Sequence, residues 1–293
     1  MGSKKILPSI TVVIDGDVED VFKTTSNGYL NRVLFVDSDN DAVLPVSEEV
    51  FLNVCQVGVA ELKMQLSQTS RKAKLERDRV RDTLAQTMAS TNATDRRIAM
   101  VMAQTKVRLI FLINTLGGCI TAESRLIGYA KIVKDNGGEV WAYGRKDVCS
   151  AGAMVFMAAD PHRRRLTCDS ELFFHLSSGA RKADNGSLVT PEMKQERIAE
   201  LEMLKRVLQR NSIASNARDS DLIKALELSD QSAPVGDDVS LSLDAQRAKR
   251  HLKVSCPTLN QVRDEYRANV GTRKVVRGLL YSPLGEPIHR FFA

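Results

Sequence analysis

The sequence predicts an α/β protein whose β-α-β units build a mainly parallel sheet, and three consecutive stretches carry this prediction. Residues 107–113 are apolar apart from Arg108, which is typical of a strand buried on both faces of a parallel sheet. Residues 120–133 then place apolar side chains at helical spacing and end at Asn136-Gly137-Gly138, a helix C-cap signal. Residues 140–143 form a second apolar strand. This order is that of a parallel crossover.

The elements around this crossover follow from local patterns. Two β-branched runs, residues 10–14 and 33–36, predict strands that open the sheet, and residues 47–102 have helical periodicity. A helix of small residues is expected to begin at residues 149–153, and short strands are expected around Leu166 and at residues 172–174.

The last third of the sequence predicts helices. The first, residues 191–211, has Thr190 as its N-cap and Pro191 in its first turn, and a second covers residues 220–228. Asp244 is expected to cap a short helix that ends near His251, and residues 259–268 form another helix before a basic tail with aromatic residues at its tip.

Composition excludes several classes of protein. The chain has 293 residues, of which 43% are apolar and 27% charged, so it is neither disordered nor fibrous. Its longest apolar run, residues 151–159, is about half as long as a membrane-spanning helix requires, and its first residues lack the apolar stretch of a secretory signal. We therefore expect a soluble protein without a membrane partner.

The five cysteines indicate a reducing environment. They are odd in number, widely spaced and without a Cys-x-x-Cys pair, which argues against a disulfide framework and against structural zinc. We therefore expect a cytoplasmic protein.

The net charge of +6 is concentrated in the long predicted helix. Two interpretations remain open for this basic segment: a solvated helix face, or a docking surface for an acidic partner or nucleic acid. An excess of this size does not by itself indicate a nucleic-acid partner, and we expect none. Its basic residues are Arg71, Lys72, Lys74, Arg77, Arg79 and Arg81.

Two motifs in the crossover region carry candidate chemistry. Gly117-Gly118 follows the strand of residues 107–113, at the sheet edge where α/β proteins collect ligands. Ser150 opens a helix, where its hydroxyl is near the positive end of the helix dipole and the N–H of Ala151 points toward a developing oxyanion. The alternative for Ser150 is a simple N-cap. Cys149 could replace it as nucleophile, but its neighbours suggest a buried thiol.

His175 is the strongest candidate for a general base among the four histidines. It ends the apolar run of residues 172–174 and precedes a loop rich in glycine and serine, which puts it at the mouth of the sheet. The other three lie in a basic turn, at a basic helix end and in the tail: His162, His251 and His289.

Residues 107–175 resemble the proteolytic subunit of the Clp protease. That family has a strand ending Ile-Asn-Ser-Pro-Gly-Gly, a nucleophile in Ala-Ser-Met-Gly-Ala, and a histidine base that ends a strand before a Gly-rich loop. The counterparts here occur in the same order and at similar spacings: Ile113-Asn114-Thr115-Leu116-Gly117-Gly118, Cys149-Ser150-Ala151-Gly152-Ala153 and Phe174-His175.

The resemblance implies a fold, a mechanism and partners. The fold would be a spiral of β-α-β units, as in the Clp and crotonase superfamily, with a helical insertion. Ser150 would be the nucleophile and His175 the base, and the N–H groups of Gly117 and Ala151 would form the oxyanion hole. No metal or cofactor is implied. The family forms stacked homo-oligomeric rings, and a separate ATPase would have to unfold large polypeptide substrates, because the chain has no Walker motif.

The acid of the catalytic triad is open between two alignments. In the family an aspartate precedes a Leu-Ser/Thr-Ala stretch by a few residues. Counting back from Leu241 selects Asp238, whereas counting back from Leu243 selects Ser240 and would leave the triad broken or dependent on Asp237 or Asp238. We predict Asp238, because an acid must fix the imidazole tautomer and stabilise the imidazolium.

These features divide the chain into three parts and leave two alternatives to a peptidase. Residues 1–31 are an N-terminal segment, residues 32–256 the Clp-like catalytic domain with the basic insertion at about 60–102, and residues 257–293 a C-terminal helix and basic tail. The predicted function is a serine endopeptidase of the Clp type. The alternatives are an inactive Clp-like subunit or scaffold, and a crotonase-type acyl-CoA enzyme, for which no carboxylate pair is evident near Gly117 or Gly152.

Overall fold

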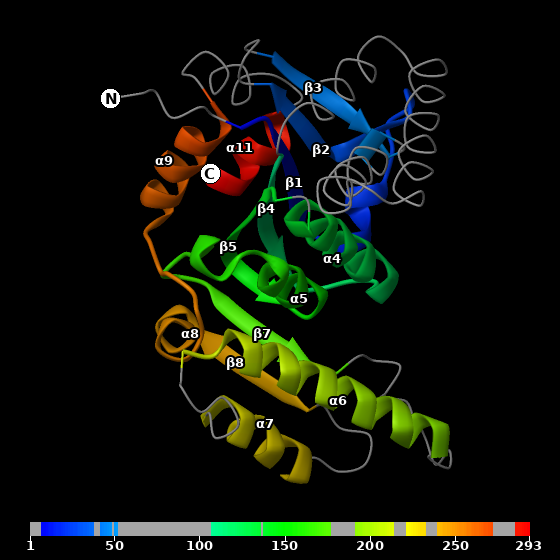
Figure 1. Ribbon diagram of the computed structural model, residues 1–293, viewed down its shortest axis with the longest axis vertical. Helices are drawn as coiled ribbons and strands as arrows, with labels where there is room; N and C mark the ends of the chain where they lie inside the picture. Colours follow the sequence, from blue (N-terminus) through cyan, green and yellow to red (C-terminus); the bar gives the residue numbers. More distant parts are fainter. Residues whose placement is uncertain are drawn as a thin grey trace, which may run out of the picture.

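One mixed sheet organises the computed structural model of the protein (Figure 1). The structure describes residues 7–37, 42–48, 50–51, 107–135, 137–176, 191–213, 221–232, 239–271 and 285–293. Within these ranges the strand order is β3-β2-β1-β4-β5-β7-β8, and β6 also pairs with β5. The strands are β1 (Ser9–Asp15), β2 (Tyr29–Asp37), β3 (Ala42–Ser47), β4 (Arg108–Thr115), β5 (Glu139–Cys149), β6 (Arg164–Leu166), β7 (Glu171–His175) and β8 (Ser240–Asp244).

The centre of the sheet is parallel, as the sequence predicts. β1 pairs with β4, β4 with β5, and β5 with both β6 and β7, all in parallel. The outer pairs β1·β2, β2·β3 and β7·β8 are antiparallel. The carboxyl ends of β4, β5 and β7 therefore lie along one edge of the sheet. Gly117 comes shortly after β4, Ser150 comes directly after β5, and His175 is the last residue of β7.

Helices cover both faces of the sheet (Figure 1). On one face of β4, Leu109, Phe111 and Ile113 pack into the larger core cluster, together with residues of the three helices that follow β4 in the chain, α4, α5 and α6. On the opposite face, Ile110 and Leu112 pack into a second cluster. This confirms the prediction of a strand buried on both sides. The helices are α4 (Ile120–Asp135), α5 (Ala151–Ala158), α6 (Pro191–Asn211), α7 (Asp221–Ser232), α8 (Ala245–His251), α9 (Leu259–Val270) and α11 (Glu286–Phe292), with the 3-10 turns η1 (Val18–Phe22) and η2 (Pro161–Arg163).

Several boundaries are close to the predicted ones, for the expected reasons. α6 begins at Pro191 and ends at Asn211. α8 is capped by Asp244, whose carboxylate accepts the N–H of Arg247 at 2.8 Å, and it ends at His251. None of the helices in the described ranges is both long and apolar enough to cross a membrane.

Two stretches of the sheet differ from the prediction. β3, which the sequence did not predict, ends at Ser47, and the helix expected from about residue 47 begins at Glu48; residues 52–106, which include the basic insertion, lie outside the described residues. β5 continues beyond Tyr143 to Cys149, because its second half pairs with β7. The tip of the tail, for which the sequence indicated no role, is part of the core, since Phe291 and Phe292 are buried with α9 in the second core cluster.

Candidate active site

Ser150 occupies a strained turn between a strand and a helix. It follows β5 and precedes α5, with φ 54° and ψ −123°, a conformation that residues other than glycine rarely adopt. Its N–H donates to the carbonyl of Phe173 at 2.8 Å, and its own carbonyl accepts from Ala153 and Met154 in the first turn of α5. The hydroxyl makes no capping hydrogen bond. The structure therefore does not support the alternative of a simple N-cap.

Two glycines allow other parts of the chain to approach this turn. A Cβ atom on Gly117, where φ is 133°, would lie 2.7 Å from the Cβ of Ser150. A Cβ atom on Gly152 would lie 2.3 Å from the Cγ2 of Thr115. The strand-to-helix loop after β4 and the first turn of α5 can pack this closely only because both residues lack a side chain.

The two neighbouring glycines differ in their surroundings. The N–H of Gly117 donates to the Oγ1 of Thr115 at 3.0 Å, so it is already bound within its own loop. Gly118, in contrast, lines the pocket beside Ser150, as does Ala151 at the start of α5. The expected oxyanion donor Gly117 thus lies against Ser150, and its N–H is bound to Thr115.

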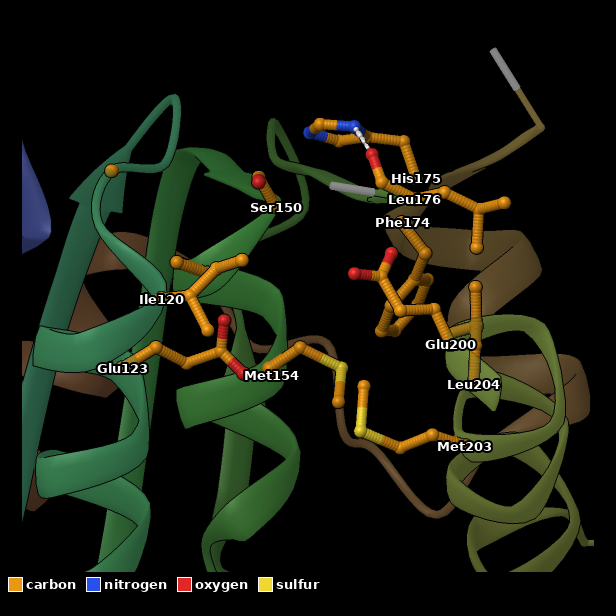
Figure 2. Close-up of a pocket in the computed structure, with 12 residues that line it drawn as sticks. Ile120, Glu123, Ser150, Met154, Phe174, His175, Leu176, Glu200, Met203 and Leu204 are labelled. Carbon is orange, nitrogen blue, oxygen red and sulfur yellow. Dashed lines mark hydrogen bonds between the residues drawn. The ribbon is translucent and has the colours of Figure 1, made fainter. Parts of the chain in front are cut away.

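His175 is at the end of β7, across the mouth of the same pocket (Figure 2). Its Nδ1 is 2.6 Å from the carbonyl oxygen of Leu176. A carbonyl oxygen can only accept a hydrogen bond, so Nδ1 carries the proton and Nε2 of the neutral ring holds the lone pair. The ring also packs against Phe173, with centroids 5.5 Å apart. This tautomer is the one that a general base needs.

The structure brings Ser150 and His175 to one pocket without joining them. Within the described part of the chain no hydrogen bond connects the Ser150 hydroxyl with the imidazole, and Figure 2 shows the two side chains on either side of the opening. Catalytic hydrogen bonds are often long without substrate and shorten in the complex.

The position of the triad acid is described only in part. Asp238 and Asp237 lie outside the described residues. Ser240, the other candidate, is directly opposite His175 in the β7·β8 register, and its N–H donates to the Oγ of Ser229 at 3.2 Å. Val239, which follows Asp238, accepts a hydrogen bond from the N–H of Leu176 at 3.2 Å. Residues 239–240 are therefore bound directly to the strand end that carries His175.

The pocket beside Ser150 has a volume of about 150 Å³ and mixed walls. Apolar side chains from α4, α5, β7 and α6 form most of it. Two carboxylates, which the sequence interpretation did not identify, also line it: Glu123 on α4 and Glu200 on α6. The full lining is Gly118, Ile120, Glu123, Ser150, Ala151, Met154, Phe174, His175, Leu176, Glu200, Met203 and Leu204.

Burial perturbs Glu123 more than any other carboxylate whose pKa shift is resolved in the described residues. Desolvation, followed by repulsion from Glu200, raises the pKa of Glu123 to about 7. A signal for it exists in the sequence: Glu123 is three residues after Ile120 and three before Leu126, so it interrupts the apolar stripe of its helix. A carboxylate within the apolar stripe of a helix is therefore a candidate for a functional residue.

Cys149 is not a good alternative to Ser150 as nucleophile. Burial is the main cause that raises the pKa of its thiol to about 11, so the reactive thiolate is scarce at neutral pH.

Among the described residues, no group of three or more His, Cys, Asp or Glu side chains is arranged to hold a metal ion.

Comparisons with known proteins find similarity among solved structures. No protein-family model and no curated protein matches the sequence. Among solved structures, the chain is similar to a mutant of ClpP1 from Listeria monocytogenes, with a TM-score of 0.39 and 14% sequence identity, over 84% of this chain and 91% of that chain. A similarity of this size defines neither the family nor the activity of this chain.

Proposed function

We propose that this chain is a serine endopeptidase of the Clp type. The observation that carries the proposal is the backbone of Ser150, which holds a non-glycine residue at φ 54° in a sharp strand-to-helix turn, at the mouth of a pocket shared with His175. Strain of this kind persists where the surroundings impose it, and it is the hallmark of a nucleophile that must stand clear of its helix. The three motifs shared with the Clp family, described above, support the same assignment.

In the proposed mechanism, the Nε2 atom of His175 removes the proton from the Ser150 hydroxyl as its oxygen attacks a peptide carbonyl. The N–H groups of Ala151 and Gly118 would bind the resulting oxyanion; we assign Gly118 rather than Gly117 because the N–H of Gly117 donates to Thr115. The imidazolium then returns the proton to the leaving amine. A water molecule, deprotonated by His175, hydrolyses the acyl-enzyme.

The carbonyl of Leu176 orients the imidazole in this proposal, and Asp238 supplies the charge that stabilises the imidazolium. Only the first of these contacts involves described residues. The hydrogen bond between Val239 and Leu176 supports the choice, because it attaches the chain next to Asp238 to the strand end of His175.

The proposed substrate is a polypeptide, and the proposed assembly is a homo-oligomeric ring that works with a separate ATPase in the cytoplasm. The apolar side chains of Ile198 and Met203 on α6 are 61% and 48% exposed, which supports a contact surface on this helix. Cys119, Cys149, Cys168 and Cys256 are free thiols, which is compatible with a reducing compartment.

Labelling with a small fluorophosphonate, read by intact mass, tests the nucleophile and the base together. We expect one adduct on the native protein and none on Ser150→Ala, with strongly slowed labelling of His175→Ala, because only an activated serine reacts quickly. An intact, folded protein that takes no label would contradict the peptidase proposal. That outcome would instead favour an inactive Clp-like subunit or scaffold.

One observation favours a second candidate, a crotonase-type acyl-CoA enzyme. Such an enzyme needs carboxylates beside a backbone oxyanion hole, and Glu123 and Glu200 line the pocket next to Ala151. The pocket volume of about 150 Å³ argues against it, since small-molecule sites typically measure about 300–1,000 Å³. Turnover of an acyl-CoA thioester that survives Ser150→Ala would establish this candidate.

A further inference from the structure

Two carboxylates enter the pocket from opposite walls below Ser150. Figure 2 shows Glu123 reaching in from α4, on the side of Ile120 and Met154, and Glu200 reaching in from α6, near Phe174. They come from two elements separated by α5 and β7 in the chain, so their meeting in one cavity is a property of the fold rather than of a local acidic run.

Glu123 has no compensating cation in the described structure. None of the described residues forms an ion pair with it, and the causes of its raised pKa are burial and the negative charge of Glu200. Two carboxylates that face one cavity repel each other when both are ionised. A positive charge placed between them would remove this repulsion and would make charge-assisted hydrogen bonds.

The other walls of the pocket suit an alkyl chain. Ile120, Met154, Phe174, Met203 and Leu204 supply apolar surface around the two carboxylates. The volume of about 150 Å³ matches a cavity known to hold one benzene-sized group, which is the scale of a single side chain. An apolar stem that ends in a cation is the shape of a lysine or arginine side chain.

We propose that this pocket selects a lysine or arginine side chain immediately before the cleaved bond of the peptide substrate, with Glu123 as the principal specificity residue and Glu200 assisting it. The inference rests on the proposed function, because it is Ser150 at the mouth that turns a side-chain pocket into a cleavage preference. A carboxylate that is costly to ionise in the empty pocket, as Glu123 is, becomes a favourable partner when a cation is bound.

A matched pair of peptidyl diphenyl phosphonates tests the inference. One carries lysine and the other norleucine at the position before the phosphonate, so the two differ by a single ammonium group. The measured quantity is the ratio of their second-order rates of adduct formation on Ser150, read by intact mass at pH 8. We expect the lysine probe to react about 10- to 100-fold faster, the range of a charge-assisted hydrogen bond in a partly buried site.

Two variants assign the preference to its residue. Glu123→Gln keeps the side-chain shape and should bring the rate ratio to about one or below. Glu202→Gln is the control, because Glu202 lies on α6 but is exposed, pairs with Lys205 and does not line the pocket; its ratio should equal that of the native protein.

The outcomes separate this inference from the function beneath it. If the small fluorophosphonate labels Ser150 while norleucine reacts as fast as lysine, or while neither peptidyl probe reacts, the inference is wrong and the peptidase proposal stands. A ratio in Glu123→Gln that equals the native ratio also overturns the assignment to Glu123. If the fluorophosphonate itself fails on folded protein, the proposed function fails and the inference falls with it.

Discussion

Gly117, in the loop between β4 and α4, lies so close to Ser150, between β5 and α5, that a side chain at Gly117 would collide with it. A Cβ atom on Gly117 would lie 2.7 Å from the Cβ and 3.0 Å from the Oγ of Ser150, and the φ of Gly117 is 133°. Glycine is thus required at this position for two reasons: its positive φ, and the lack of space for a side chain beside Ser150. Space beside the serine hydroxyl is what an attacking nucleophile needs, so the two residues form one structural unit.

Gly117→Ala should therefore affect both stability and labelling. The methyl group meets Ser150 at less than van der Waals distance and sits on an unfavourable φ, so we expect a loss of about 1–3 kcal/mol in the free energy of unfolding. Urea denaturation measures the loss, and fluorophosphonate labelling should slow markedly.

Gly128→Ala is the matched control for this substitution. Gly128 lies within α4, and a Cβ atom there would meet nothing within 4 Å. This variant should gain about 0.5–1 kcal/mol from helix propensity and label normally. Equal stabilities for the two variants would show that the loop tolerates a side chain beside Ser150.

The strain at Ser150 predicts an inverted order of two substitutions. Glycine usually destabilises a protein relative to alanine, but at φ 54° and ψ −123° glycine is unstrained and alanine is not. Ser150→Gly should therefore be more stable than Ser150→Ala, by about 1–3 kcal/mol. Thermal and urea unfolding of the two variants provide the measurement, and neither should react with a serine probe. A more stable Ser150→Ala would mean that the turn carries no strain.

Sequence patterns predicted the parts of the fold that depend on local chemistry. The apolar run of β4 indicated burial on both faces, Pro191 marked the start of α6, and Asp244 marked the cap of α8. β3 was missed, because a short edge strand with Pro45 in it has little periodicity. The burial of Phe291 was missed for another reason: two aromatic residues at the end of a basic tail indicate a core only when the partner face is known.

The candidate site, like the fold, was predictable only where local sequence patterns indicate it. Ser150 was identified by its place at the start of a helix and His175 by its place at the end of a strand, and the parallel pairing of β5 with β7 brings the two residues to one edge of the sheet. Glu200 was not predictable, since nothing near α6 in sequence points to a cavity formed with α4. The N–H of Gly117 was assigned to the oxyanion, whereas its partner Thr115 becomes evident only from the loop conformation.

The C-terminal aromatic residues are expected to be essential for folding. Phe291 is 2% exposed and packs with Phe292 at 5.0 Å between ring centroids, in the core cluster of the second face. Phe291→Ala should lower the free energy of unfolding by about 3–5 kcal/mol, the range for truncating a buried phenylalanine. Urea denaturation tests this. A change below about 1 kcal/mol, typical of a surface position, would show that α11 does not cover the sheet in solution.

Substitutions should show which of Asp238, Asp237 and Ser240 occupies the third position of the catalytic triad. If Asp238 stabilises the imidazolium, Asp238→Asn should slow labelling by about 10³- to 10⁴-fold, as expected for loss of the triad acid. Asp237→Asn and Ser240→Ala should then have small effects. Rates of adduct formation at pH 8, on proteins with native circular dichroism spectra, give the comparison. The largest loss in Ser240→Ala would move the role to the residue opposite His175 in the β7·β8 register.

The raised pKa of Glu123 predicts a specific dependence of stability on pH. Burial raises this pKa from 4.5 in the unfolded chain to about 7, so between these values the native protein binds more protons at Glu123 than the unfolded chain does. Raising the pH through this window therefore lowers the stability of the native protein, and above about 7 the full penalty is present.

Glu123→Gln removes that penalty because glutamine does not ionise. The variant should match the native protein near pH 4.5 and exceed its free energy of unfolding by at most about 3 kcal/mol at pH 8, with solvent screening reducing the gain. Among the described residues, the other ionisable groups that line the pocket are Glu200 on α6 and His175 on β7; η1 brings Glu19 to the N–H of Cys119, and α5 contributes no charged residue.

The measurement for Glu123 is the difference in urea denaturation between variant and native protein at several pH values from 5 to 8. Groups present in both proteins, His175 included, largely cancel in this difference, so its slope reports Glu123. Glu202→Gln, on the exposed side of α6, should give a flat difference. A flat difference for Glu123→Gln as well would mean that Glu123 is solvated in the folded protein, and it would leave the pocket without the buried carboxylate on which its selectivity depends.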